Sequence, residues 1–194
     1  MRFLFIAMRR ADFRDEVLAE LLAPLEADGT STLWEAVGRR FTGLTYREAD
    51  RLSKTNKEFI RGLFPDRIYA TLLSHEAQRM IGAVGEHSRG VEKLLRRIGF
   101  AYADRVDPFD GGPHFLCPTD EILAVRSSTE VLVRSIGAAE SHDLRLVARQ
   151  TSEPPYFIAT ATRGTAKDAA DLTESSARQL GVNLGDRVWM LPIH

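Results

Sequence analysis

The clearest pattern of apolar and polar positions lies between residues 89 and 99. Four apolar residues there fall on one face of a helix: Val91, Leu94, Leu95 and Ile98. Four basic residues fall on the opposite face: Arg89, Lys93, Arg96 and Arg97. The pattern predicts an amphipathic helix that ends at Gly99, with its basic face in solvent.

Other segments of the N-terminal part favour helix or strand less clearly. Residues 1–12 are consistent with a helix or a buried strand, and residues 17–22 with a helix or a buried strand stopped by Pro24. Periodicity does not separate the two structures in such short apolar runs. Residues 68–73 are rich in strand-forming side chains, and residues 100–107 are expected to form a strand.

Hydroxyl side chains indicate where helices begin. Thr30 or Ser31 can cap a short helix, and Ser74 can start another that runs through Ile81. Residues 46–63 are predicted to be helical in two pieces.

The pattern changes from about residue 122 onward, where short apolar runs alternate with turn-rich stretches. The runs are Ile122–Val125, Val131–Val133, Leu144–Val147, Phe157–Ala161 and Val188–Leu191. One helix is expected, over residues 172–180. We therefore predict an α+β protein with a first domain over residues 1–120 and a small, mostly β domain over residues 121–194.

Composition adds few constraints. The 194 residues carry a formal net charge of -1, which gives no electrostatic reason to expect nucleic acid or an anionic membrane as a partner. No segment is apolar enough for a membrane span. Cys117 is the single cysteine, so an internal disulfide and a cysteine-based zinc site are excluded, and a cytoplasmic location is expected.

Two segments are candidates for chemistry. His87 lies in a glycine-flanked loop at a helix start, where proton transfer is plausible, and Ser88 is expected to cap that helix. The loop matches no phosphate-binding fingerprint, and the histidines show no metal-ligand spacing, so no metal or cofactor site is predicted. Residues 109–113, Phe-Asp-Gly-Gly-Pro, form either a structural turn or a loop that brings Asp110 and backbone amides to a ligand.

Several motifs together resemble the arginine N-succinyltransferase family. The resemblance rests on Ser31–Phe41, on Tyr69 with Ser74–Gly82, on Ile98-Gly99-Phe100 and on Phe109–Pro113 with Cys117 just beyond. It extends from the first residue to about residue 120 and covers only the back portion of the family. It implies a partial GCN5-related N-acetyltransferase-like mixed sheet with flanking helices, in which residues 17–22 form a strand.

The resemblance also implies an activity: transfer of a succinyl group from succinyl-CoA to the α-amino group of L-arginine in arginine catabolism. Succinyl-CoA would be a co-substrate whose site lies largely outside this chain, so we expect the isolated chain to be inactive. The family's catalytic histidine position falls on Gly85, which leaves His87 as the candidate general acid. Asp110, Gly111 and Gly112 are the candidate substrate-binding residues.

The sequence is consistent with two hypotheses about the role of the chain. In the first, it works with a missing N-terminal half or a protein partner, in an oligomeric enzyme. In the second, it is a non-catalytic subunit or truncated relative that assembles with a complete acyltransferase. The sequence does not distinguish arginine from ornithine as the acceptor.

Overall fold

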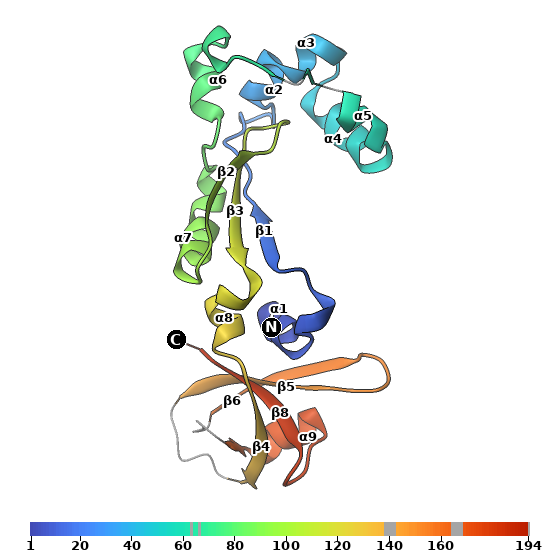
Figure 1. Ribbon diagram of the computed structural model, residues 1–194, viewed down its shortest axis with the longest axis vertical. Helices are drawn as coiled ribbons and strands as arrows, with labels where there is room; N and C mark the ends of the chain where they lie inside the picture. The colour runs from blue at the N-terminus through green and yellow to red at the C-terminus, as the bar shows by residue number, and fades with distance from the viewer. Residues whose placement is uncertain (63, 66, 138–142, 164–168, 194) are drawn as a thin grey trace. The chain divides into compact units, whose positions relative to one another are not determined.

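The structure of the chain, a computed structural model, describes residues 1–62, 64–65, 67–137, 143–163 and 169–193 (Figure 1). Residue contacts divide the chain into two units. The terminal unit joins Met1–Asp15 to Pro118–His194, and the central unit is Glu16–Cys117. Residues 1–15 thus group with the C-terminal region in this division, and the predicted domains 1–120 and 121–194 stay a prediction.

The central unit contains a three-stranded sheet in the order β1-β3-β2. Its strands are β1 (Glu16–Glu20), β2 (Ala101–Val106) and β3 (Pro113–Pro118). Its helices are α2 (Thr32–Ala36), α3 (Gly38–Thr42), α4 (Tyr46–Thr55), α5 (Lys57–Gly62), α6 (His75–Met80) and α7 (Arg89–Arg97). The strand that the resemblance implied for residues 17–22 is therefore present as β1, and the helical alternative is wrong.

Side-chain caps fix the starts of two predicted helices. The Ser31 hydroxyl accepts a hydrogen bond from the Trp34 N–H at 3.1 Å at the start of α2. The Ser74 hydroxyl accepts one from the Ala77 N–H at 3.2 Å at the start of α6. The expected cap at Ser88 is wrong, because its side chain makes no capping bond and α7 directly follows a 3₁₀ helix at Glu86–Ser88.

The strand-forming residues 68–73 do not form a strand. A 3₁₀ helix at Ala70–Leu72 takes their place. The Leu72 side chain is 82% exposed, and within the described part of the chain no strand pairs with this segment. Strand propensity is expressed only where a neighbouring backbone completes the hydrogen bonds.

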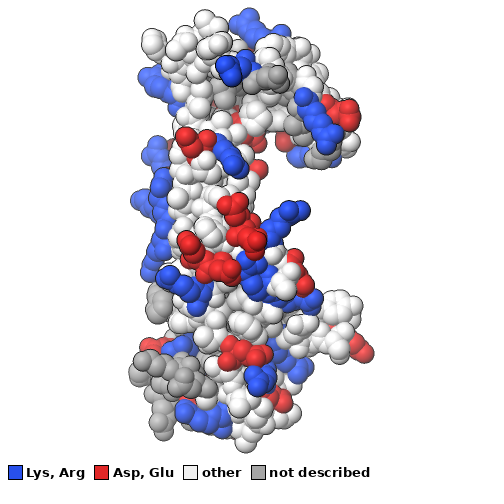
Figure 2. All heavy atoms as spheres, in the orientation of Figure 1, with Lys and Arg blue, Asp and Glu red and all other residues white. Residues whose placement is uncertain are grey.

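Helix α7 forms with the predicted apolar and basic faces, but its apolar face is only partly buried. Leu95 and Ile98 are half-buried, whereas Leu94 is 61% exposed. Lys and Arg side chains line the visible side of α7 in Figure 2, as expected for a solvent face. Arg96 also lies over the Phe115 ring of β3, 4.8 Å from its centroid, which holds the helix against the sheet.

The terminal unit is built on a five-stranded sheet in the order β6-β5-β8-β4-β7. Its strands are β4 (Thr129–Ile136), β5 (Leu144–Gln150), β6 (Phe157–Arg163), β7 (Ala169–Leu172) and β8 (Arg187–Pro192). Its helices are α1 (Arg2–Met8), α8 (Leu123–Arg126) and α9 (Glu174–Leu180). Strands β4 and β7 are parallel, whereas the pairs β4–β8, β5–β6 and β5–β8 are antiparallel.

Successive side chains of β8 point to opposite faces of the sheet and so belong to two different apolar clusters of the terminal unit. Val188 belongs to the cluster that includes Leu180 of α9, and Leu191 belongs to the cluster that includes Leu4 of α1. Four of the five apolar runs lie in strands as predicted. The run Ile122–Val125 is an exception, because α8 packs there as a short helix against α1.

Candidate functional site

A cavity of about 490 Å³ opens beside His87 in the central unit, and we call it the His87 cavity. Residues from the chain after β1, from α4 and from the loop before α7 line it: Leu22, Ala23, Pro24, Leu25, Glu26, Ala27, Gly29, Arg47, Gly85, Glu86, His87 and Ser88. His87 and Glu86 are exposed to solvent there. The volume lies within the range of ordinary ligand pockets, roughly 300–1,000 Å³.

The loop that carries Gly85 is bonded to the chain that leaves β1. The Gly85 N–H donates to the Leu22 carbonyl at 2.8 Å. A Cβ atom at position 85 would lie 2.8 Å from the Ala23 carbonyl oxygen and 3.0 Å from the Leu22 carbonyl oxygen. Any side chain at position 85, histidine included, therefore requires the backbone to move.

The loop over residues 109–113 reaches the same segment of chain. The Asp110 carboxylate accepts hydrogen bonds from the Gly112 N–H at 2.7 Å and from the Ala23 N–H at 3.4 Å. A Cβ atom at Gly112 would collide with the Leu21 carbonyl oxygen, and Gly111 has φ of 84°. Only glycine adopts that φ without strain.

The structure thus brings the predicted site residues together around the backbone of Leu21–Ala23, which sequence reasoning did not single out. Asp110 is only 3% exposed and is occupied with backbone amides. The arrangement braces the two loops against each other. Substrate binding by Asp110, Gly111 and Gly112 stays a prediction.

Burial is the main influence on the pKa of the Asp110 carboxyl group and raises it above the usual range. The negative charge of Asp107 raises this pKa further, whereas the hydrogen bonds from the Gly112 and Ala23 amides lower it. Burial, followed by the nearby charge of Asp110, raises the pKa of Tyr46 to about 12, so Tyr46 stays a hydrogen-bond donor at neutral pH.

Charges of both signs border the His87 cavity. Arg47 is exposed, and its Nη2 donates to the Asp28 carbonyl at 3.2 Å. Glu26 accepts a hydrogen bond from the Thr32 hydroxyl at 3.0 Å, and Glu86 is exposed on the opposite segment. Sequence reasoning missed Arg47 and Glu26, since each looks like an ordinary surface charge until the fold brings it to the cavity.

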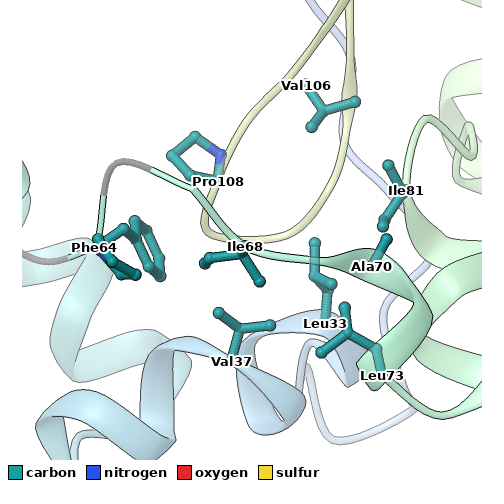
Figure 3. A pocket seen from close by; sticks show the side chains of 10 residues that line it. Leu33, Val37, Phe64, Ile68, Ala70, Leu73, Ile81, Val106 and Pro108 are labelled. Atoms are coloured by element: carbon teal, nitrogen blue, oxygen red, sulfur yellow. The ribbon is translucent and has the colours of Figure 1, made fainter.

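A second cavity of about 290 Å³ in the central unit has a different character (Figure 3). Apolar side chains point into it from α2, from the chain between α5 and α6, and from the end of β2: Leu33, Val37, Phe64, Pro65, Ile68, Ala70, Leu73, Ile81, Val106 and Pro108. It contains no charged or acid–base side chain among these residues. The histidine and the charged side chains described above lie at the His87 cavity instead.

Among the described residues, no group of three or more His, Cys, Asp or Glu side chains is arranged to hold a metal ion. In the same residues, no helix has the length and apolar character needed to cross a membrane.

Comparisons with known proteins place the chain among N-acyltransferases. The family model for the arginine N-succinyltransferase beta subunit matches residues 1–124. An arginine N-succinyltransferase from Yersinia enterocolitica is 36% identical over 197 residues, which cover 100% of this chain and 57% of the relative. One from Escherichia coli is 33% identical over 189 residues, covering 96% of this chain and 55% of the relative.

A solved structure agrees. The arginine/ornithine succinyltransferase subunit AI from Pseudomonas aeruginosa has a TM-score of 0.82 and 31% identity, covering 100% of this chain and 56% of that one. The chain belongs to the arginine N-succinyltransferase family. It spans a little over half the length of these relatives. The predicted fold class, α+β with a partial GCN5-related N-acetyltransferase-like region, is confirmed.

Proposed function

We propose that this chain carries the acceptor side of an arginine N-succinyltransferase, which transfers succinyl from succinyl-CoA to the α-amino group of L-arginine. The observation that carries the proposal is the family match over residues 1–124, which includes every residue that lines the His87 cavity. The cavity is large enough for an amino acid, and it has charges of both signs and a histidine at its border.

The reaction requires a neutral amine next to a thioester. The α-amino nitrogen attacks the thioester carbonyl carbon, and the intermediate collapses with formation of the C–N bond and cleavage of the C–S bond. The CoA thiolate leaves and takes up one proton, while the new amide nitrogen loses one. The protein has to orient the two reactants, stabilise the oxyanion and supply the proton to the leaving thiolate.

His87 is our candidate for that proton donor. It lies in the 3₁₀ helix that directly follows Gly85, on the border of the cavity and open to solvent. Position 85 itself carries no side chain, and the carbonyl oxygens of Leu22 and Ala23 fill the space where its Cβ would stand. A donor placed after Gly85 in the same loop avoids that conflict.

The charges at the border suit the substrate. The Arg47 guanidinium is suited to pairing with the α-carboxylate of the amino acid, and the Glu26 and Glu86 carboxylates with its guanidinium group. Succinyl-CoA is bound as a co-substrate, mainly by the part of the family fold that this chain does not span. That part is supplied by a further polypeptide segment or a protein partner, and the assembly works in the cytoplasm.

The test is a transfer assay on the assembled protein. The chain is co-expressed with the part of the Yersinia enterocolitica relative that the alignment leaves out, and purified product is incubated with succinyl-CoA and L-arginine. Mass spectrometry is expected to find arginine succinylated at the α-amino group, and free CoA in equal amount. An assembled protein that forms no product would contradict the proposal and favour a non-catalytic subunit. L-Ornithine in parallel reactions shows which acceptor is preferred.

A further inference from the structure

A further cavity, of about 440 Å³, lies within the terminal unit, where β5 ends and β8 begins. Its lining comes from β4, β5 and β8, from α1 and from the turn that follows α9 (Figure 1). We call it the Arg149 cavity. Its volume is that of an ordinary small-molecule pocket, and none of its lining residues belongs to the His87 cavity.

The pairing of β5 with β8 stops at this cavity. The last pair joins Ala148 to Trp189. Beyond it, β5 continues to Gln150 and β8 begins at Arg187, and no pair joins these described residues. Each strand keeps its other neighbour there, since Gln150 pairs with β6 and Arg187 with β4. The ladder is therefore open at this end, and residues of both strands line the cavity.

The charge of Arg149, on the cavity lining, has no partner in the described part of the chain. Its Nε is buried and makes no hydrogen bond. The rest of the guanidinium also forms no hydrogen bond or ion pair with a described residue. A charged donor that is shielded from water is costly without an acceptor, so folded proteins supply one from the chain, from water or from a ligand. Arg149 is therefore available to an acceptor in the cavity.

The end of α9 holds this guanidinium in place. Gly181 ends the helix with φ of 64°, and a Cβ atom there would lie 3.1 Å from Nη2 of Arg149. Two carbonyls at that helix end, those of Ala177 and Arg178, already accept the Val182 and Gly181 N–H groups. The helix end thus positions the guanidinium without forming a hydrogen bond to it.

Both carboxylates on the cavity lining have other partners. Glu130 Oε2 accepts from Arg187 Nη1 at 2.9 Å, so these two charges offset each other. Asp186 Oδ2 accepts from the Asn183 N–H at 2.7 Å, and the structure shows no ion pair between Asp186 and Arg149. The negative charge of Asp186 on the same lining disfavours a multiply charged anion more than a singly charged one.

These contacts define the chemical class of the ligand. A guanidinium binds a carboxylate through two parallel hydrogen bonds. Half-buried Met8 and Trp189 and buried Val182 add apolar surface to the lining. We propose that the Arg149 cavity binds a small organic monocarboxylate, with its carboxylate on Arg149 and its hydrocarbon part on Trp189. This inference does not rest on the proposed function, and its test involves no succinyl transfer.

Titration of the full chain with sodium butyrate, followed by NMR, tests the proposal. The chain has two tryptophans, so its proton–nitrogen correlation spectrum contains two indole signals, and Trp189→Phe identifies the signal of Trp189. Butyrate should shift that signal saturably, with a dissociation constant of about 1 mM or below. The signal of Trp34 should not move, because Trp34 is fully buried in the central unit.

Two further probes test the ligand class at equal ionic strength. n-Butanol has the same hydrocarbon chain without a carboxylate, and inorganic phosphate at about pH 8 is a mostly doubly charged anion. Both should bind about tenfold more weakly than butyrate, or less tightly still. Butanol or phosphate binding as tightly as butyrate would overturn the proposal.

Three variants test the role of the guanidinium. Arg149→Gln should weaken butyrate binding about tenfold or more, and Arg149→Lys about threefold or more, because lysine keeps the charge but lacks the paired donors. The lysine variant supplies the comparison if the glutamine variant does not fold. Arg126→Gln is the matched control, an exposed arginine of α8 outside the cavity lining, and should bind as the wild type does. A Trp189 signal that does not respond to butyrate, or wild-type affinity in the folded Arg149 variants, would overturn the proposal.

Discussion

Three glycine-to-alanine changes test how tightly the two loops pack on the chain that leaves β1. At Gly85 the added Cβ lies 2.8 Å from the Ala23 carbonyl oxygen, and at Gly112 it collides with the Leu21 carbonyl oxygen. At Gly90, inside α7, nothing lies within 4 Å of it. The added methyl group therefore meets no backbone atom at Gly90, a close carbonyl oxygen at Gly85 and an overlapping carbonyl oxygen at Gly112.

The magnitudes follow from two opposing effects. Gly85 has φ of -59° and ψ of 148°, which alanine adopts freely, so the entropy of the unfolded chain alone would favour alanine by roughly 0.4–1 kcal/mol. Overpacking against a fixed carbonyl costs roughly 1–3 kcal/mol. We expect Gly85→Ala to lose about 1–2 kcal/mol of unfolding free energy and Gly112→Ala about 3 kcal/mol. Gly90→Ala should gain about 0.5–1 kcal/mol.

Urea unfolding followed by circular dichroism measures these differences as shifts in midpoint at constant slope. The expected order of stability is Gly90→Ala, wild type, Gly85→Ala and Gly112→Ala. A Gly85→Ala protein as stable as Gly90→Ala would refute the claim that position 85 has no room for a side chain. The reason for the absence of a histidine there would then have to be sought elsewhere.

Two further predictions concern the buried Asp110 carboxyl group and the core residue Trp34. Burial raises the pKa of Asp110 in the folded state, so the folded protein holds this proton more tightly than the unfolded chain, whose carboxyl titrates near 3.8. The wild type should therefore lose stability relative to Asp110→Asn as the pH rises from 3.8 through the folded pKa, and parallel urea midpoints across acidic pH would contradict this. Trp34 is fully buried, stacks on Phe109 at 5.1 Å and donates to the Leu44 carbonyl. Trp34→Ala should cost about 3–5 kcal/mol in urea unfolding, and a loss below about 1 kcal/mol would show that the stack contributes little.

The sequence was informative where a local signal agrees with the tertiary environment. Ser31 and Ser74 cap helices as their positions indicate, because a cap needs only the amides two or three residues ahead. The apolar runs at residues 68–73 and 122–125 did not become strands. Whether such a run forms a strand depends on a neighbouring backbone or on packing against a helix such as α1, which local composition does not encode.

The candidate site was only partly accessible from sequence. The loops at Gly85–His87 and Asp110–Gly112 stood out through their glycines and the family resemblance. Their meeting point, the backbone of Leu21–Ala23, has no distinctive residue type and follows only from the fold. Arg47 and Glu26 reach the cavity from segments that look like ordinary surface.

The rate of succinyl transfer in the assembled protein with His87→Ala tests the central claim most directly. His75→Ala is the matched control, an exposed histidine of the same unit on α6, outside the residues that line the His87 cavity. Loss of a general acid lowers kcat by about 100-fold or more, whereas removal of a surface histidine leaves it unchanged. We predict that difference at saturating arginine and succinyl-CoA, and equal kcat values for the two variants would contradict the role of His87 as proton donor.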